Sequence, residues 1–128
     1  MMRKEADLLR KRALNFLKNA KDLFKKGIFD IAAFNLEQFC QLYLKYKLFM
    51  EIGEFPKTHS IRDLLLELGK ASSKKGEVRK FLTANISTIK NLENAYITSR
   101  YIPIEFEKEE VNEMLKFVKN FKNFVDNL

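Results

Sequence analysis

The segment from Gly27 to Phe49 constrains the fold most strongly, because its pattern predicts one long helix that is apolar on nearly every side. Its main apolar seam recurs at steps of four and three residues and consists of Ala32, Leu36, Phe39, Tyr43 and Tyr46. A second apolar face consists of Phe34, Leu42, Leu44 and Leu48. We expect a helix of this kind to lie in the middle of a helical bundle, with neighbours on several sides.

One narrow polar row interrupts this helix. Gln38, Gln41 and Lys45 fall at steps of three and four residues, so they lie along one line of the helix surface. Two interpretations stay open. The row either faces solvent or caps the end of a neighbouring helix, as long polar side chains commonly do, or it lines a polar groove along the central helix.

Length and composition favour one small all-α domain covering residues 1–128. The chain is 46% apolar and 32% charged, and only four Gly and two Pro are available for turns. A single Cys and a single His exclude a Cys/His zinc site, and no other metal or cofactor is predicted. No signal-peptide pattern and no apolar run of about 20 residues is visible, so we expect a cytoplasmic protein without a membrane span.

The first helix is predicted from about Lys4 to Lys26, with Gly27 as its left-handed C-terminal cap. Residues 1–26 hold nine basic and three acidic side chains, so this helix carries most of the net charge of +7. Its outer face either tracks phosphate groups or is an ordinary solvated, lysine-rich face.

Four further helical segments are expected after the first. The central helix ends near Gly53, and Ser60 caps a short helix after a loop over residues 54–59. A helix from about Glu77 to the mid-90s has Asn85 in its apolar seam, where a buried Asn fixes the register. Pro103 stops that helix, and the last one begins near Glu107. The predicted fold is an antiparallel up-and-down bundle of four long helices and one short helix.

Alternating helix directions bring distant polar residues to one end of such a bundle. We expect Lys45, His59, Arg100 and Tyr101 to share that end with the acidic start of the last helix and with Arg3 and Lys4. An Arg beside a Tyr offers a planar fork to phosphate and a ring face to a base. The simpler alternatives are a loop hydrogen bond for His59 and an exposed ion pair for Arg100.

These motifs, taken in order, resemble the HEPN family (higher eukaryotes and prokaryotes nucleotide-binding domains) over nearly the whole chain. The matching elements are Ala32-Ala33-Phe34 through Gln38, Leu44-Lys45, Pro56-Lys57-Thr58-His59 before Leu64-Leu65, and Arg100-Tyr101-Ile102-Pro103. Two departures are visible: Gln41 stands where many members carry Glu, and Ile102 is an insertion in the Arg-Tyr-Pro element. The ribonuclease branch of the family also has a His four to six residues after an Arg, and this chain has none at that distance.

The resemblance implies a helical bundle that often dimerises and often acts with a small nucleotidyltransferase, in toxin–antitoxin or regulatory pairs. It also implies nucleotide or RNA binding. Our leading hypothesis is that Arg100 and Lys45 hold phosphate, Tyr101 stacks on or shields the base, and His59 orients the loop. Tyr101 is also the position that such a partner would modify.

Without the downstream His, the leading hypothesis is a non-catalytic protein. Two alternatives stay open: a metal-independent ribonuclease with a site rearranged around Arg100 and His59, and a purely structural dimerisation or adaptor module.

Overall fold

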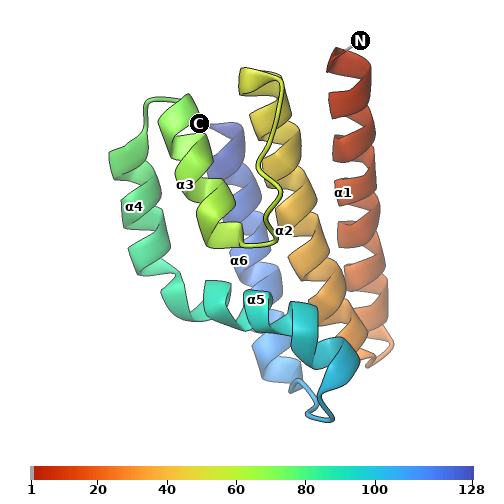
Figure 1. The fold of residues 1–128 in the computed structure, drawn as a ribbon. Helices are drawn as coiled ribbons and strands as arrows, with labels where there is room; N and C mark the ends of the chain where they lie inside the picture. Colours follow the sequence, from red (N-terminus) through yellow and green to blue (C-terminus); the bar gives the residue numbers. More distant parts are fainter. Residues whose placement is uncertain (1) are drawn as a thin grey trace.

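The computed structural model describes residues 2–128, and this part of the chain is all helical, as predicted (Figure 1). The six helices are α1 (Met2–Lys25), α2 (Phe29–Ile52), α3 (Ile61–Ala71), α4 (Lys75–Ala84), α5 (Ile86–Tyr101) and α6 (Lys108–Asp126). Helix α2 lies at the centre, where α1, α3, α5 and α6 all pack against it. Its long apolar surface therefore has neighbours on several sides, as the sequence indicates.

Several helix ends lie where the local sequence signals place them. Gly27 follows α1 with φ of +77°, in the left-handed region that glycine adopts easily, and the Ile28 amide donates to the Leu23 carbonyl at 2.9 Å. Ser60 precedes α3, and its hydroxyl oxygen accepts a hydrogen bond from the Asp63 amide at 3.1 Å. Glu107 begins α6 with a reciprocal capping box that involves Glu110.

The helix predicted from Glu77 to the mid-90s is two helices, α4 and α5, so the prediction of four long helices and one short helix is wrong in this detail. The break falls at Asn85, which has φ of −121° and ψ of 18°. The Asn85 side-chain amide donates to the Phe81 carbonyl at 2.8 Å and so competes with helical hydrogen bonding. Asn85 is half-buried at this junction and is not a buried seam residue that fixes register.

Because of this break, α5 runs across the lower end of the bundle, while α4 descends beside α3 (Figure 1). The inner side of α5 contributes Ile89, Leu92 and Ala95 to the core. The amide of Phe106, in the connection to α6, donates to the Asp30 carboxylate at 2.6 Å. This bond ties the α5–α6 corner to the start of α2.

The connection between α2 and α3 changes the expected topology. Gly53 has φ of +75° and reverses the chain, and residues 53–60 then run back along α2 before α3 begins (Figure 1). Phe55 holds this segment against α2, with its ring centre 6.1 Å from that of Phe49 and 5.5 Å from Lys45 Nζ. The start of α3 therefore lies beside the middle of α2, not at its end.

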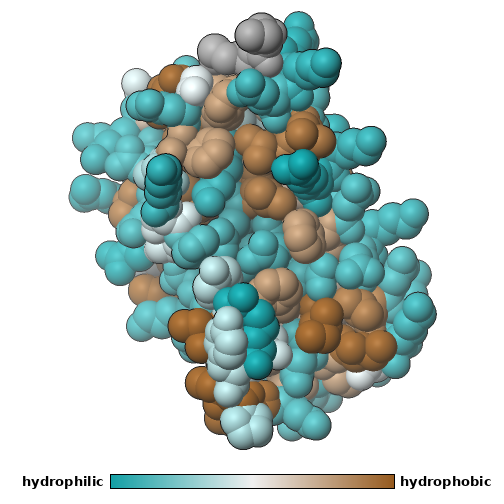
Figure 2. Space-filling view, turned by 45° about the vertical axis from the view of Figure 1, so that its right-hand side comes forward, coloured by the Kyte–Doolittle hydropathy of each residue, from teal (hydrophilic) through white to brown (hydrophobic). Residues whose placement is uncertain are grey.

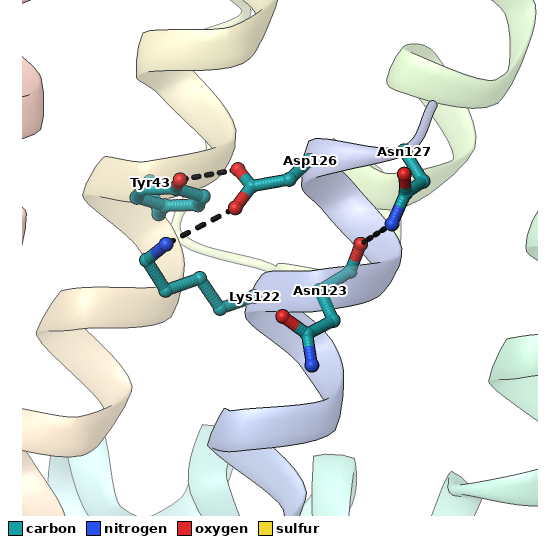
Figure 3. Close-up of polar contacts among 5 residues, drawn as sticks. All are labelled: Tyr43, Lys122, Asn123, Asp126 and Asn127. Carbon is teal, nitrogen blue, oxygen red and sulfur yellow. Dashed lines mark hydrogen bonds and ion pairs between the residues drawn. The ribbon is translucent and has the colours of Figure 1, made fainter.

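The C-terminal half of α6 is fastened to α2 by a polar contact in an otherwise apolar interface (Figure 3). The buried Tyr43 hydroxyl donates to the Asp126 carboxylate, and Lys122 pairs with the same carboxylate at 3.0 Å. Burial and this bond raise the pKa of Tyr43 far above its ordinary value. Although burial opposes the shift, the bonds from Tyr43 and Lys122 lower the pKa of Asp126.

Candidate functional site

The polar row of α2 includes a buried carboxylate that our sequence analysis did not select. Glu37 lies one turn before Gln41, and its side chain is fully buried. Its two oxygens accept hydrogen bonds from the side-chain amides of Gln41 and Gln38, the latter at 2.8 Å. The row therefore does not face solvent along its length, because Gln41 is buried and Gln38 is half-buried.

The environment of Glu37 places its titration near neutral pH. Burial raises its pKa to about 7, and Glu93 adds to the rise, while the Gln41 and Gln38 amides and the charge of Arg100 act in the opposite direction. A carboxyl group that titrates at this pH, beside a cationic side chain, is a common feature of ligand and catalytic sites.

Gln41 connects this buried carboxylate to the surface. Its amide nitrogen donates to Glu37, so its carbonyl oxygen remains as an acceptor, and this oxygen lies 3.3 Å from His59 Nδ1. Because an amide oxygen only accepts, His59 Nδ1 must carry the proton of this bond. In the neutral ring Nε2 is then unprotonated, and it can accept a proton or a hydrogen bond.

Tyr96 of α5 brings His59 and Arg100 together. The exposed His59 ring stacks on the Tyr96 ring at 4.9 Å, and Arg100 Cζ lies 4.4 Å from the centre of the same ring. The His59 ring and Arg100 Cζ therefore lie within about 9 Å of each other. Tyr96 therefore links the His59 loop to the Arg100 guanidinium.

Aromatic rings fix the position of the Arg100 guanidinium. Besides Tyr96, the rings of Phe34 and Tyr101 lie 5.3 and 4.8 Å from Arg100 Cζ, and Arg100 Nε donates to the Tyr96 carbonyl at 2.9 Å. No carboxylate among residues 3–128 forms an ion pair with Arg100, so the alternative interpretation of Arg100 as part of an exposed ion pair does not hold in this part of the chain. The exposed guanidinium keeps its outer nitrogens available for an anion.

The loop that carries His59 is anchored on the opposite side by Glu93. The Ser60 hydroxyl donates to Glu93 Oε2 at 2.9 Å, and the Arg62 amide approaches the same oxygen at 3.5 Å. Glu93 and Arg100 both lie on α5, so one helix positions the His59 loop as well as the guanidinium. This arrangement gives the site a rigid frame.

The structure brings together some of the predicted residues and separates others. His59, Arg100 and Tyr101 lie with Gln38 and Gln41 beside the middle of α2 and the end of α5. Lys45 lies one turn further along α2, half-buried under Phe55, and burial lowers its pKa. The start of α1, which carries Arg3 and Lys4, lies at the opposite end of the bundle from α5, which carries Arg100, so their predicted inclusion is wrong (Figure 1). The physical reason is that residues 53–60 return along α2 and start α3 halfway down.

One pattern in the sequence could have revealed Glu37. It is the only acidic residue between Asp30 and Glu51, and it lies four residues before Gln41, in the same row. Among residues 3–128, no group of three His, Cys, Asp or Glu side chains is placed to hold a metal ion. Within residues 2–128, we also find no helix with the length and apolarity of a membrane span.

The family model of the HEPN domain matches residues 6–128. The chain belongs to the HEPN domain family. HEPN membership points to a function related to nucleotides or RNA in general, and HEPN domains commonly dimerise. Neither a curated protein nor a solved structure matched the chain.

Proposed function

We propose that this HEPN domain binds a nucleotide or RNA phosphate between His59 and Arg100, without cleaving it. The observation that carries the proposal is the guanidinium of Arg100, which three aromatic rings hold in place while no carboxylate among residues 3–128 forms an ion pair with it. Because a guanidinium presents several donors in a rigid planar fork, it can donate two parallel hydrogen bonds to two oxygens of one phosphate.

The aromatic surroundings supply the second part of the recognition. Tyr101 is 70% exposed beside Arg100, so its ring face can stack on a base. Lys45 adds positive charge in the same polar row without touching the phosphate directly. Glu37 acts through Gln41, which holds His59 in the tautomer with a proton on Nδ1.

We further propose that the domain works as a homodimer and with a nucleotidyltransferase partner, in a toxin–antitoxin or regulatory pair. Support for the dimer comes from the family, whose domains commonly dimerise. The exposed position of Tyr101 beside the phosphate site makes its hydroxyl accessible to such a partner.

Calorimetric titration of ATP, GTP and a short RNA into the wild type and Arg100→Ala tests the binding proposal. We expect the variant to lose binding without a fall in melting temperature. A fall in melting temperature together with lost binding would assign Arg100 to the fold instead.

A second candidate function is metal-independent RNA cleavage, favoured by the placement of His59 and Arg100 on one ring. Incubation of a labelled RNA with the wild type and His59→Ala, in the presence of a chelator, separates the two functions. Cleavage by the wild type that His59→Ala abolishes would replace binding by catalysis.

A further inference from the structure

The outer side of α5 is apolar as well as its inner side. Ile86 and Ile97 lie on one exposed stripe together with Lys90 and Asn94, opposite the side that packs into the core. Ile86 is 48% exposed and Ile97 is 51% exposed. A helix with two apolar sides needs a partner on each, and the described chain covers only one of them.

The break at Asn85 leaves a basic cleft beside one end of this stripe. The cleft has a volume of about 410 Å3 between α3, α4 and α5, and its floor is formed by Leu66, Leu82, Ile86 and Ile89. Arg62, Arg79 and Lys90 line its walls, and no carboxylate among residues 3–128 forms an ion pair with them. Glu93 also reaches the wall, where the start of α3 already binds its carboxylate. The floor holds no aromatic ring, which suits aliphatic side chains better than bases.

The other end of the stripe presents the complementary chemistry. In the connection from α5 to α6, Ile102 is 44% exposed and Ile104 is 64% exposed. This connection and the residues directly after it are acidic in balance, since they hold four carboxylates, Glu105, Glu107, Glu109 and Glu110, and one ammonium group, Lys108. Figure 2 shows apolar side chains gathered among polar ones at the lower end of the molecule, where this corner lies.

We infer that a second copy of this chain packs antiparallel against the outer side of α5, with residues 102–105 of each copy in the α3–α4–α5 cleft of the other. A two-fold axis near Asn94 places Ile86 of one copy opposite Ile102 of the second, because both are eight residues from the axis. The contact is then isologous, so the acidic connection meets the basic cleft twice. This charge pairing offsets the repulsion between two chains of net charge +7.

The same register suits the polar residues in the middle of the stripe. Asn94 of each copy faces Asn94 of the other at the axis, and a side-chain amide can pair with its own copy because it carries both a donor and an acceptor. Lys90 of one copy lies opposite Thr98 of the other, since both are four residues from the axis, so no like charges meet there. Arg100 and Glu93 flank the stripe on the side toward Tyr96 and remain outside its centre. The inference rests only on the dimerisation part of the proposed function.

A charge-exchange experiment tests the contact. We expect Arg79→Glu/Lys90→Glu and Glu105→Lys/Glu109→Lys each to weaken dimerisation at least tenfold in analytical ultracentrifugation, because like charges then meet at both contacts. An equimolar mixture of the two variants should restore the dimer. In the mixed dimer, one contact joins a cleft of reversed charge to a connection of reversed charge, and the other joins a native cleft to a native connection. The matched control is Lys11→Glu/Lys18→Glu on the exposed face of α1, which should leave dimerisation unchanged.

A cysteine experiment tests the register without altering charge. Ile86→Cys mixed with Ile102→Cys should form a disulfide between chains under mild oxidation, whereas either variant alone should not, because Cys40 is buried. Ile52→Cys at the far end of α2 is the control for random cross-linking.

The inference is overturned by a monomeric wild type, by unchanged dimerisation in both charge variants, by a mixture that stays monomeric, or by cross-links between two Ile86→Cys chains. Titration of ATP and RNA into the same variants is a separate readout. Retained ligand binding in a monomeric wild type would refute this interface and leave the phosphate site intact.

Discussion

The side-chain oxygen of Gln41 lies 3.3 Å from Nδ1 of His59 and joins the exposed ring to a buried carboxylate. The amide nitrogen of Gln41 donates to Glu37, so this one side chain connects the buried carboxylate of α2 to the loop that carries His59.

Replacing Gln41 by Leu removes both bonds and leaves the Nδ1 proton of His59 unfixed. We expect Gln41→Leu to weaken phosphate binding several-fold, because a hydrogen bond of this kind contributes about 1 kcal/mol. Calorimetry beside Gln38→Leu, which keeps His59 in contact with Gln41, measures this effect. Equal losses in both variants would show that Gln41 does not act through His59.

Stability should depend on pH through Glu37. Its pKa is about 7 in the folded chain and 4.5 as the ordinary value, so the folded state holds this proton more tightly. The free energy of unfolding therefore falls as pH rises from about 4.5 to 7 and then levels off. We expect Glu37→Gln to gain about 3 kcal/mol relative to the wild type between pH 4.5 and pH 8, as the pKa difference implies. Urea unfolding at both pH values measures it, with Glu51→Gln at an exposed position as the control. If the difference in unfolding free energy between Glu37→Gln and the wild type stays constant across this pH range, burial does not raise the pKa of Glu37.

Close packing between α3 and α4 depends on a glycine. A Cβ atom added at Gly69 would lie 3.0 Å from Val78 Cγ2, and Val78 is the one buried residue of α4 among the described side chains. We expect Gly69→Ala to lower the free energy of unfolding by about 1–3 kcal/mol, as overpacking does. Gly76→Ala is the matched control, since its Cβ would meet nothing within 4 Å. This control should stabilise the helix by about 0.5–1 kcal/mol, and a stabilising Gly69→Ala would contradict the packing account.

The hydroxyl of Tyr43 fastens α6 to α2 through Asp126 (Figure 3). Tyr43→Phe leaves the ring stacked on Phe39 but removes this donor from a buried position. We expect a loss of about 1–3 kcal/mol in thermal or urea unfolding, because the bond is made to a charged group. Tyr46→Phe is the control, since no hydrogen bond from its hydroxyl is found within residues 3–128. An equal effect in both variants would show that the Asp126 contact adds nothing to stability.

Most helices of this fold follow from local signals that the structure confirms. Gly27, Ser60 and Pro103 mark helix ends through backbone chemistry that depends on few neighbours. The prediction for Asn85 is wrong, because an Asn in an apolar seam suits either a buried residue that fixes the helix register or a helix break. Only tertiary packing selects between the two. The path of residues 53–60 depends on Phe55 packing against α2, a contact that sequence spacing does not specify.

The candidate site was predictable only in part, because its residues are brought together by tertiary contacts that sequence spacing does not specify. His59, Arg100 and Gln41 share it because of the return of one loop and the crossing of α5, although the direction argument placed His59 and Arg100 at the end of the bundle. Glu37 was not selected from the sequence, because a single Glu in an apolar helix is usually a solvent-exposed residue. Its burial depends on the helices that pack against α2 in the folded chain.

The location of the bound ligand tests the central claim most directly, because the basic outer face of α1 offers a competing site. Backbone chemical shifts of the labelled wild type, followed during titration with ATP and with a short RNA, map that location residue by residue. Our account predicts shifts concentrated at residues 59–60, 96 and 100–101, and their loss in Arg100→Ala but not in Arg3→Ala. Shifts confined to α1, or unchanged in Arg100→Ala, would contradict a phosphate site between His59 and Arg100.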